Sequence, residues 1–177
     1  GYKKASESSM FKAAVYYIDM DAWSYEDVTV GSQTVKKPIN SPFENIGIEF
    51  NYEKMMDKHF SYSLGIDISN PKEKPQDEGP WKRKYAREQY TGSLKYQNRD
   101  FNAAFSGSIT ADRAGGWKDK MPMNFYMGYK VSNNSRVDLV CENILDRKDI
   151  VSNWTSATST EYYAMPRNVR VTYTYTF

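Results

Sequence analysis

The sequence closes with Arg167-Asn-Val-Arg-Val-Thr-Tyr-Thr-Tyr-Thr-Phe177, a stretch of strict period-two alternation. One face of a strand built from it carries only apolar or aromatic side chains, namely Val169, Val171, Tyr173, Tyr175 and Phe177. The other face carries Arg170 and the threonines. β-Branched and aromatic residues favour strands. A strand of this kind that ends on an aromatic residue is typical of the closing strand of an outer-membrane β-barrel.

The composition is compatible with such a barrel. Of the 177 residues, 40% are hydrophobic, and the mean hydropathy of −0.77 is that of a hydrophilic chain. No window approaches the roughly 18 consecutive apolar residues of a transmembrane helix, whereas transmembrane strands alternate and average out to polar. The 15 Tyr, 8 Phe and 4 Trp would suit the aromatic girdles at two membrane interfaces. Composition alone fits a tyrosine-rich soluble β-sandwich equally well.

Charge and the rare residue types argue against several functions. The formal net charge of +2 lacks the basic excess of a nucleic-acid binder. Cys141 is the only cysteine, so the chain has no internal disulfide and no thiol-based metal cluster. His59 is the only histidine, and we expect it to form an ion pair with Asp57 in a turn. We therefore expect no enzyme, no cofactor, no metal site and no nucleic-acid partner.

Alternation of apolar and polar residues predicts about eight strands. The clearest run is 60–69, where apolar residues alternate with Ser, Gly and Asp. Asp19 and Asp21 blur the alternation of the first strand, which a β-bulge or an exit from the membrane would explain. The predicted strands cover residues 10–23, 46–53, 60–69, 90–96, 101–111, 123–131, 136–145 and 167–177.

The connections between these strands alternate between two lengths. Three are short, at 56–58, 98–100 and 132–135, and the others run for about 10 residues or more. Bacterial outer-membrane barrels have short periplasmic turns and long extracellular loops. We therefore expect an antiparallel transmembrane sheet with its short turns and C-terminus in the periplasm and its long loops outside the cell. A soluble barrel such as a lipocalin would turn its apolar face inward instead.

Four stretches resemble motifs of the TonB-dependent outer-membrane receptors, in the order in which that family has them. They are Gly1-Tyr-Lys3 ahead of Ala13-Ala-Val-Tyr-Tyr-Ile-Asp19, Asn45-Ile-Gly-Ile-Glu-Phe50, Asn143-Ile-Leu-Asp-Arg-Lys148, and Pro166-Arg167 with Phe177. The family imports ferric siderophores, haem, cobalamin and some glycans. This chain departs from the pattern twice. The glycine usual between Pro166 and Arg167 is missing, and Asp149 stands where the family often has an aromatic residue.

The resemblance implies that residues 1–177 form one unit, the C-terminal part of a 22-stranded barrel. The plug domain, the TonB box and the first strands would lie outside this chain. It opens on Gly1 without an initiator Met, so we expect part of a longer precursor, or a barrel that another chain completes. A self-contained eight-stranded outer-membrane barrel with a structural or adhesive role is the alternative.

The implied function is uptake of a scarce nutrient across the outer membrane, above all a ferric siderophore or similar iron chelate. TonB would energise this transport through the plug. The implied partners are outer-membrane lipid and lipopolysaccharide, the remainder of the receptor, the TonB complex and the iron chelate. The resemblance also marks Tyr173, Tyr175 and Phe177 as the signal for barrel assembly.

The long loops are the candidate ligand-binding regions. The stretch Trp81-Lys-Arg-Lys-Tyr-Ala-Arg87 combines two aromatic residues with four cations. It would suit an anionic chelate through charge and cation-π contacts, or the phosphates of lipopolysaccharide, and a solvated rim or lipid-headgroup contact is the alternative. The candidate residues are Trp81, Lys82, Arg83, Lys84, Tyr85, Arg87, Trp117 and Trp154.

A set of ionisable residues falls on the polar faces of the predicted strands. In a receptor barrel it would hold the plug, and in a small closed barrel its members would pair with one another. The set is Glu49, Glu53, Lys95, Lys130, Arg136, Asp138, Glu142 and Arg170.

Overall fold

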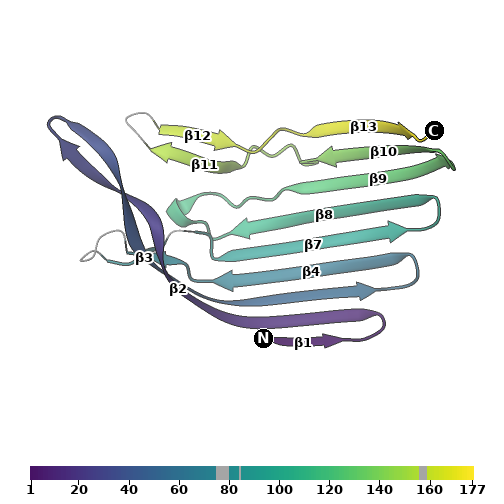
Figure 1. Cartoon of the computed structure of the whole chain (residues 1–177), viewed down its shortest axis with the longest axis horizontal. Coiled ribbons are helices and arrows are strands. Elements are labelled where there is room, and N and C mark those ends of the chain that lie inside the picture. The colour runs from purple at the N-terminus through teal and green to yellow at the C-terminus, as the bar shows by residue number, and fades with distance from the viewer. Residues whose placement is uncertain (75–79, 84, 156–158) are drawn as a thin grey trace.

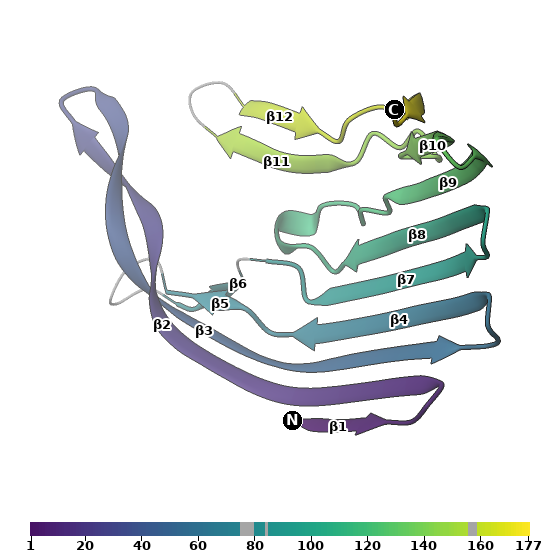
Figure 2. The ribbon, with the colours of Figure 1, turned by 45° about the vertical axis from the view of Figure 1, so that its right-hand side comes forward.

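The computed structural model describes residues 1–74, 80–83, 85–155 and 159–177. In this part of the chain, nine antiparallel strands follow one another across one curved sheet, as Figures 1 and 2 show. They are β1 (Tyr2–Ala5), β2 (Ser9–Val30), β3 (Gln33–Met55), β4 (Phe60–Ser69), β7 (Glu88–Gln97), β8 (Phe101–Ala111), β9 (Met123–Ser132), β10 (Ser135–Glu142) and β13 (Asn168–Tyr175). The all-β antiparallel fold expected from the alternation is confirmed.

The register places the apolar side chains of neighbouring strands on one face, which we call the outer face. Ile48 pairs with Val15 and Ile68, and Leu94 pairs with Phe105. These side chains are exposed: Val15 keeps 74% of its accessible surface. A soluble protein rarely leaves so large an apolar surface uncovered, whereas a membrane covers it with lipid. The arrangement is that of a transmembrane sheet, and not of a soluble sandwich or lipocalin.

The opposite face, which we call the polar face, does not form a hydrophobic core. Phe43 is the only buried hydrophobic side chain in the described part of the chain. Ser41 is fully buried nearby, and its hydroxyl donates to the carbonyl of Lys74 at 2.6 Å. Within that same part, no helix is long and apolar enough to cross a membrane.

Four short turns lie at one end of the sheet, together with the C-terminus, and we call this the short-turn end (Figure 1). The turns are residues 6–8, 56–59, 98–100 and 133–134. Asp57 Oδ1 accepts from the backbone amides of His59 and Phe60 at 2.6 and 2.8 Å. Asn98 Oδ1 does the same for the amides of Asp100 and Phe101, at 3.0 and 2.8 Å. Asp and Asn close turns in this way from sequence positions two or three residues away.

The expected ion pair between His59 and Asp57 is wrong. The imidazole Nδ1 of His59 lies 2.9 Å from the carbonyl oxygen of Gln97, on the neighbouring turn. Asp57 instead accepts from the backbone amide of His59. The histidine therefore links two turns, and the carboxylate closes one of them.

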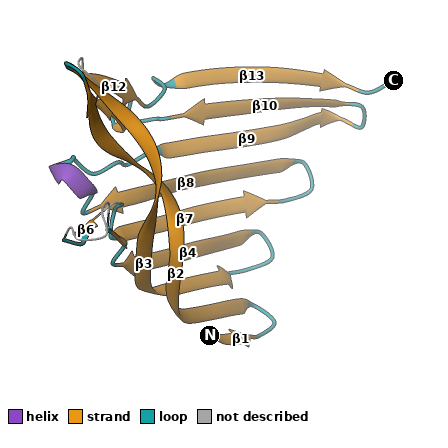
Figure 3. Ribbon diagram, turned by 60° about the vertical axis from the view of Figure 1, so that its left-hand side comes forward, coloured by secondary structure: helices purple, strands orange, loops and turns teal. Residues whose placement is uncertain are grey.

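The opposite end, which we call the long-loop end, departs most from the prediction. Strands β2 and β3 continue past residue 23 as a twisted hairpin, which rises away from the sheet in Figure 3. The strands pair residue for residue from Ser9 with Lys54 to Val30 with Gln33, and only Gly31 and Ser32 turn between them. This continuous register rules out a β-bulge at Asp19 and Asp21. One of the expected long loops is therefore a hairpin.

Two strand boundaries also differ from the prediction. Tyr2–Ala5 forms β1 against Met10 to Ala13, so nine strands follow one another across the sheet where about eight were expected, and the short β5 and β6 add to them. β10 ends at Glu142, three residues early, because Asn143 adopts a left-handed conformation with φ of 49°. Asparagine tolerates that conformation better than most residues.

Candidate functional site at the long-loop end

The long-loop end carries several short elements in addition to the hairpin. β5 (Lys72–Glu73) pairs with β3 and with β6 (Lys82–Arg83), and a 3-10 turn covers Ala114–Gly116. β11 (Ile150–Thr155) and β12 (Ser159–Tyr163) form a separate two-stranded hairpin. The candidate residues of the loops are therefore held on short paired segments.

Two of the candidate cations are engaged in structural ion pairs. Arg83 pairs with Asp112, and its Nη2 also donates to the carbonyl of Arg113 at 2.8 Å. Arg87 lies 3.7 Å from the second oxygen of Asp112 and donates to Asn70 Oδ1 at 3.2 Å. Both guanidinium groups thus tie the loop 70–87 to the end of β8. A ligand would have to compete with these contacts.

The other described residues of the stretch are more accessible. Trp81 lies beneath the ammonium of Lys72, which is 5.8 Å from the ring centroid, and Lys82 is exposed. Tyr85 packs edge-on against Phe43 at 6.0 Å, yet it keeps 56% of its surface exposed. Lys84 lies outside the described residues. Tyr85 is therefore an aromatic side chain that is both positioned and accessible.

Arg113, which the sequence did not single out, organises the neighbouring loop. It is 8% exposed, and its guanidinium donates to the carbonyls of Lys118 and Ile150 at 2.9 and 2.7 Å. The same group stacks over the ring of Trp117, with 4.8 Å between the guanidinium carbon and the ring centroid. The 3-10 turn brings Trp117 back over Arg113 through Gly115, whose φ is 78°. Trp117 is thus held in place.

A depression beside Trp117 has a volume of about 630 Å³, which is large enough for a small ligand. Tyr85 and Trp117 contribute aromatic surface to it, and Lys120 contributes a cation. Gln89 and Thr110, paired on adjacent strands, form its polar floor. Lys120 has no carboxylate within 4 Å in the described part of the chain. Aromatic rings beside a free cation can bind an anionic ligand that has flat or apolar parts.

Two of the motif stretches meet in space. Asn143 Nδ2 donates to the carbonyls of Arg147 and Met165, at 3.0 and 2.8 Å. Asp146 accepts from the backbone amide of Arg167 at 2.9 Å. These contacts join the end of β10 to the segment that leads into β13, on either side of the β11–β12 hairpin. The Asn and Asp of the motif are therefore a clasp at the base of that hairpin.

Asp149, where the sequence departs from the family pattern, links two loops. Its carboxylate accepts from Arg147 Nε at 3.0 Å and from the amide of Met121 at 2.8 Å. Burial would raise the pKa of Asp149, but these two donors outweigh burial and the pKa lies below its ordinary value. Arg147 also donates to the carbonyl of Asp119 at 2.9 Å. A charged residue at this position thus fastens loop 112–122 to the clasp.

The remaining predicted residues lie elsewhere. Trp154 falls in β11, and its side chain is outside the described residues. Tyr173 and Tyr175 are exposed on the outer face of β13, and the ring of Tyr175 contacts Phe177 at 5.1 Å. Their role in assembly stays a prediction.

The polar face carries two cross-strand networks. Tyr16 reaches across Gly47 and donates to the carboxylate of Asp67 at 3.1 Å. A Cβ at Gly47 would lie 2.5 Å from the Tyr16 ring, so only glycine leaves room for it. In the second network the guanidinium of Arg136 donates to Asp138, on the same strand, at 2.8 Å. It also donates to Tyr126 of β9 at 2.6 Å and to Asn102 of β8 at 2.7 Å, and so joins three strands. Ionisable residues expected on this face, Arg136 and Asp138, thus pair with each other.

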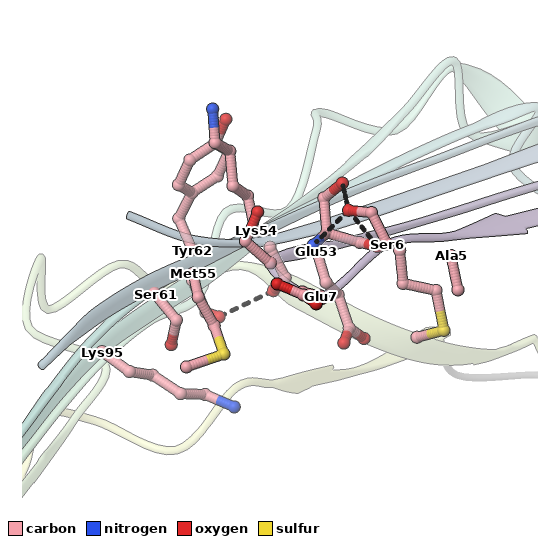
Figure 4. Close-up of a pocket in the computed structure, with 14 residues that line it drawn as sticks. Ala5, Ser6, Glu7, Glu53, Lys54, Met55, Ser61, Tyr62 and Lys95 are labelled. Carbon is pink, nitrogen blue, oxygen red and sulfur yellow. Dashed lines mark hydrogen bonds between the residues drawn. The ribbon is translucent and has the colours of Figure 1, made fainter. Parts of the chain in front are cut away.

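A second depression, of about 440 Å³, lies at the short-turn end and is lined by residues of both faces (Figure 4). Glu7, Glu53 and Lys95 are among the residues that line it, together with several serines. It is mixed in charge, and Tyr62 is the aromatic residue that lines it, whereas both Tyr85 and Trp117 line the depression at the long-loop end. We therefore take the depression beside Trp117 as the candidate ligand site.

Comparison by sequence gives no relative: no family model and no curated protein matches the chain. Solved structures do match. The copper transporter OprC aligns with a TM-score of 0.73 at 12% identity, over 99% of this chain and 30% of that protein. The ferric yersiniabactin uptake receptor FyuA from Yersinia pestis gives 0.74 at 11% identity, over 99% and 28%. The ferric-catecholate import receptor Fiu from E. coli K12 gives 0.68 at 14% identity, over 97% and 26%.

The chain has the fold of part of a TonB-dependent receptor barrel. It spans less than a third of the length of each of these proteins. The fold expected from the four motif stretches is thereby confirmed. The three structures named above are those of transporters and receptors, and not of enzymes.

Proposed function

We propose that this chain is the C-terminal part of the barrel of an outer-membrane receptor that imports an anionic metal chelate, such as a ferric siderophore. The short-turn end would face the periplasm and the long-loop end the cell exterior. A plug domain outside these residues would couple transport to TonB. The fold is that of transporters for copper and iron complexes, and the outer face is suited to lipid.

The depression beside Trp117 carries the proposal for the ligand class. It lies on the polar face at the proposed exterior end, where a ligand would arrive. Tyr85 and Trp117 would contact its flat or apolar parts, and Lys120 would neutralise its charge. Arg113 would act as a positioning residue, because its own donors are already used within the loop.

The alternative, a self-contained eight-stranded barrel, would need its first and last strands to pair. In the described residues β1 pairs with β2 alone, and β13 pairs with β10 alone. The two strands lie at opposite edges of the open sheet in Figure 2. The arrangement therefore favours a larger barrel, to which these residues contribute one wall.

The test is ligand binding by the complete receptor with the changes Trp117→Ala and Lys120→Gln. With a ferric catecholate and with copper(II) as separate probes, we expect the double change to weaken binding of the catecholate about tenfold, since it removes an aromatic surface and a charge. Lys118→Gln is the matched control, because Lys118 is exposed and does not line the depression. Unchanged affinity in the double variant would remove the site. A receptor that binds copper(II) but no ferric catecholate would overturn the ligand class.

A further inference from the structure

The outer face of the sheet has opposite charge at its two ends. At the long-loop end carboxylates predominate: Asp19 pairs directly with Glu44, and Glu88 pairs with Ile68 and Ala111. Lys72 pairs with Glu44 on β5, and its ammonium lies 4.0 Å from the Glu44 carboxylate. At the short-turn end it carries two lysines. Lys4 pairs with Phe11, and Lys54 pairs with Tyr62, which places both lysines on the face of the exposed apolar side chains. The charge is therefore sorted along the direction in which the strands would cross the membrane.

The two lysines have no internal counter-ion. In the described part of the chain, neither Lys4 nor Lys54 lies within 4 Å of a carboxylate, and both are exposed. The nearby carboxylate of Glu53 belongs to the opposite face, where it lines the depression with Lys95. Figure 4 draws Lys54 and Tyr62 projecting together on one side of the sheet, and Lys95 on the other. A negative charge from outside the chain would complete the arrangement.

Aromatic side chains surround the two lysines. The rings of Tyr52 and Tyr62 lie 5.9 Å apart, and Phe11 contacts Tyr2 at 6.1 Å and Phe50 at 4.9 Å. Such rings lie at the level of the headgroups in membrane barrels. Lysine stems can follow the apolar surface while the ammonium reaches the headgroup layer. Lys4 lies on β1 and Lys54 on β3, with β2 between them and an offset of two residues along the strands. Strand geometry then puts their Cα atoms about 12 Å apart, so both side chains can reach one phosphate.

We propose that Lys4 and Lys54, with the hydroxyl of Tyr62, bind the phosphate headgroup of an anionic phospholipid in the leaflet at the short-turn end. The aromatic platform of Tyr2, Phe11 and Tyr52 packs against its acyl chains. This inference rests on the proposed membrane location, but not on the identity of the imported ligand.

Native mass spectrometry of the complete receptor in detergent tests the site, with phosphatidylglycerol as the probe and phosphatidylcholine as the neutral comparison. Replacing both lysines, K4Q/K54Q, should weaken phosphatidylglycerol retention about tenfold or more and leave phosphatidylcholine unchanged. The matched control is K95Q/K130Q, which removes two charges from the polar face near the same end. Equal loss in the two variants, or no loss in K4Q/K54Q, would overturn the proposal.

A second measurement covers the case in which K4Q/K54Q fails to assemble. Retention of phosphatidylglycerol by the unaltered receptor should fall as salt rises from about 50 to 500 mM, because headgroup attraction is screened. Retention that does not change with salt would overturn the proposal without any variant. Chelate binding is read separately: the receptor can lose the lipid and keep the ligand, so the two proposals fail independently.

Discussion

The two ends of the sheet are held together in different ways. At the short-turn end each turn is closed by a side chain within it, as by Asp57 for residues 59 and 60. At the long-loop end the donors and acceptors are distant in sequence. Arg113 bonds to Ile150, 37 positions away, and Asp149 bonds to Met121, 28 positions away. One end is therefore a row of turns that are each closed from within, two of which are also linked by the contact of His59 with Gln97, and the other is a single network of loops.

This difference predicts that damage spreads at the long-loop end and stays local at the short-turn end. A network that joins three loops should open as one unit when a shared residue is lost. A turn that closes on itself should open without its neighbours. Hydrogen exchange of backbone amides distinguishes these two behaviours, since it reports opening segment by segment.

The largest effect within this comparison is expected for Arg113→Ala. The change leaves the carbonyls of Lys118 and Ile150 without their donor and removes the support of Trp117. We therefore expect the free energy that stabilises these loops to fall by about 2 to 3 kcal/mol. Amides in both loop 112–122 and β11 should exchange faster. Lys118→Ala is the control, since only the backbone of Lys118 takes part. Faster exchange confined to loop 112–122 would show that the loops are not coupled.

A smaller effect is expected from acid at Asp149. Its folded-state pKa is lowered, so its contribution is present above the ordinary carboxyl pKa of about 4 and is lost as pH falls through the lower folded value. Loop 112–122 should therefore become more sensitive to an acid-active protease as the pH falls below about 4. Asp149→Asn should be equally sensitive at pH 6 and at pH 3. Retention of the pH step in that variant would assign the step to another group.

The smallest effect is expected for Asn98→Ala. It removes the acceptor for the amides of Asp100 and Phe101, which should cost about 0.5 to 1 kcal/mol. Only those two amides and their close neighbours should exchange faster, and turn 56–59 should stay unchanged. Asn98→Asp retains an acceptor and should behave as the unaltered chain does. Faster exchange at turn 133–134 as well would contradict the closure of each turn from within.

The difference in polarity between the two faces of a strand explains which strands the sequence predicts. Residues 60–69 alternate cleanly because one face meets lipid and the other is polar, and β4 has those bounds. The upper part of the hairpin has charges on both faces, as in the pairs of Asp27 with Lys36 and of Glu26 with Lys37. A strand without contrasting faces has no period of two to detect. The prediction of that strand therefore stopped near residue 23, where the contrast ends.

The candidate site was only partly predictable for a related reason. Trp117 and Tyr85 are conspicuous as loop aromatics, and both line the depression. Arg113 and Lys120 are ordinary cations in sequence, and their importance depends on contacts made across loops. Arg83 and Arg87 illustrate the reverse case: a dense run of cations suggests ligand binding, and their charges also meet Asp112. Sequence spacing does not reveal such distant pairing.

The central claim is that one face of the sheet meets lipid and the other does not. Leu64 and Ser63 are neighbours in sequence on opposite faces: Leu64 pairs with Gly92 and is 51% exposed, and the Ser63 hydroxyl bonds that of Ser93 at 2.7 Å. An arginine on the lipid face near the middle of a bilayer costs about 2 to 4 kcal/mol. The most direct measurement is the yield of heat-modifiable, membrane-inserted receptor for Leu64→Arg against Ser63→Arg, repeated at Phe105 and Ser106. The account predicts failed insertion for Leu64→Arg and Phe105→Arg with near-normal insertion for the two serine variants. Equal insertion of all four variants would contradict it.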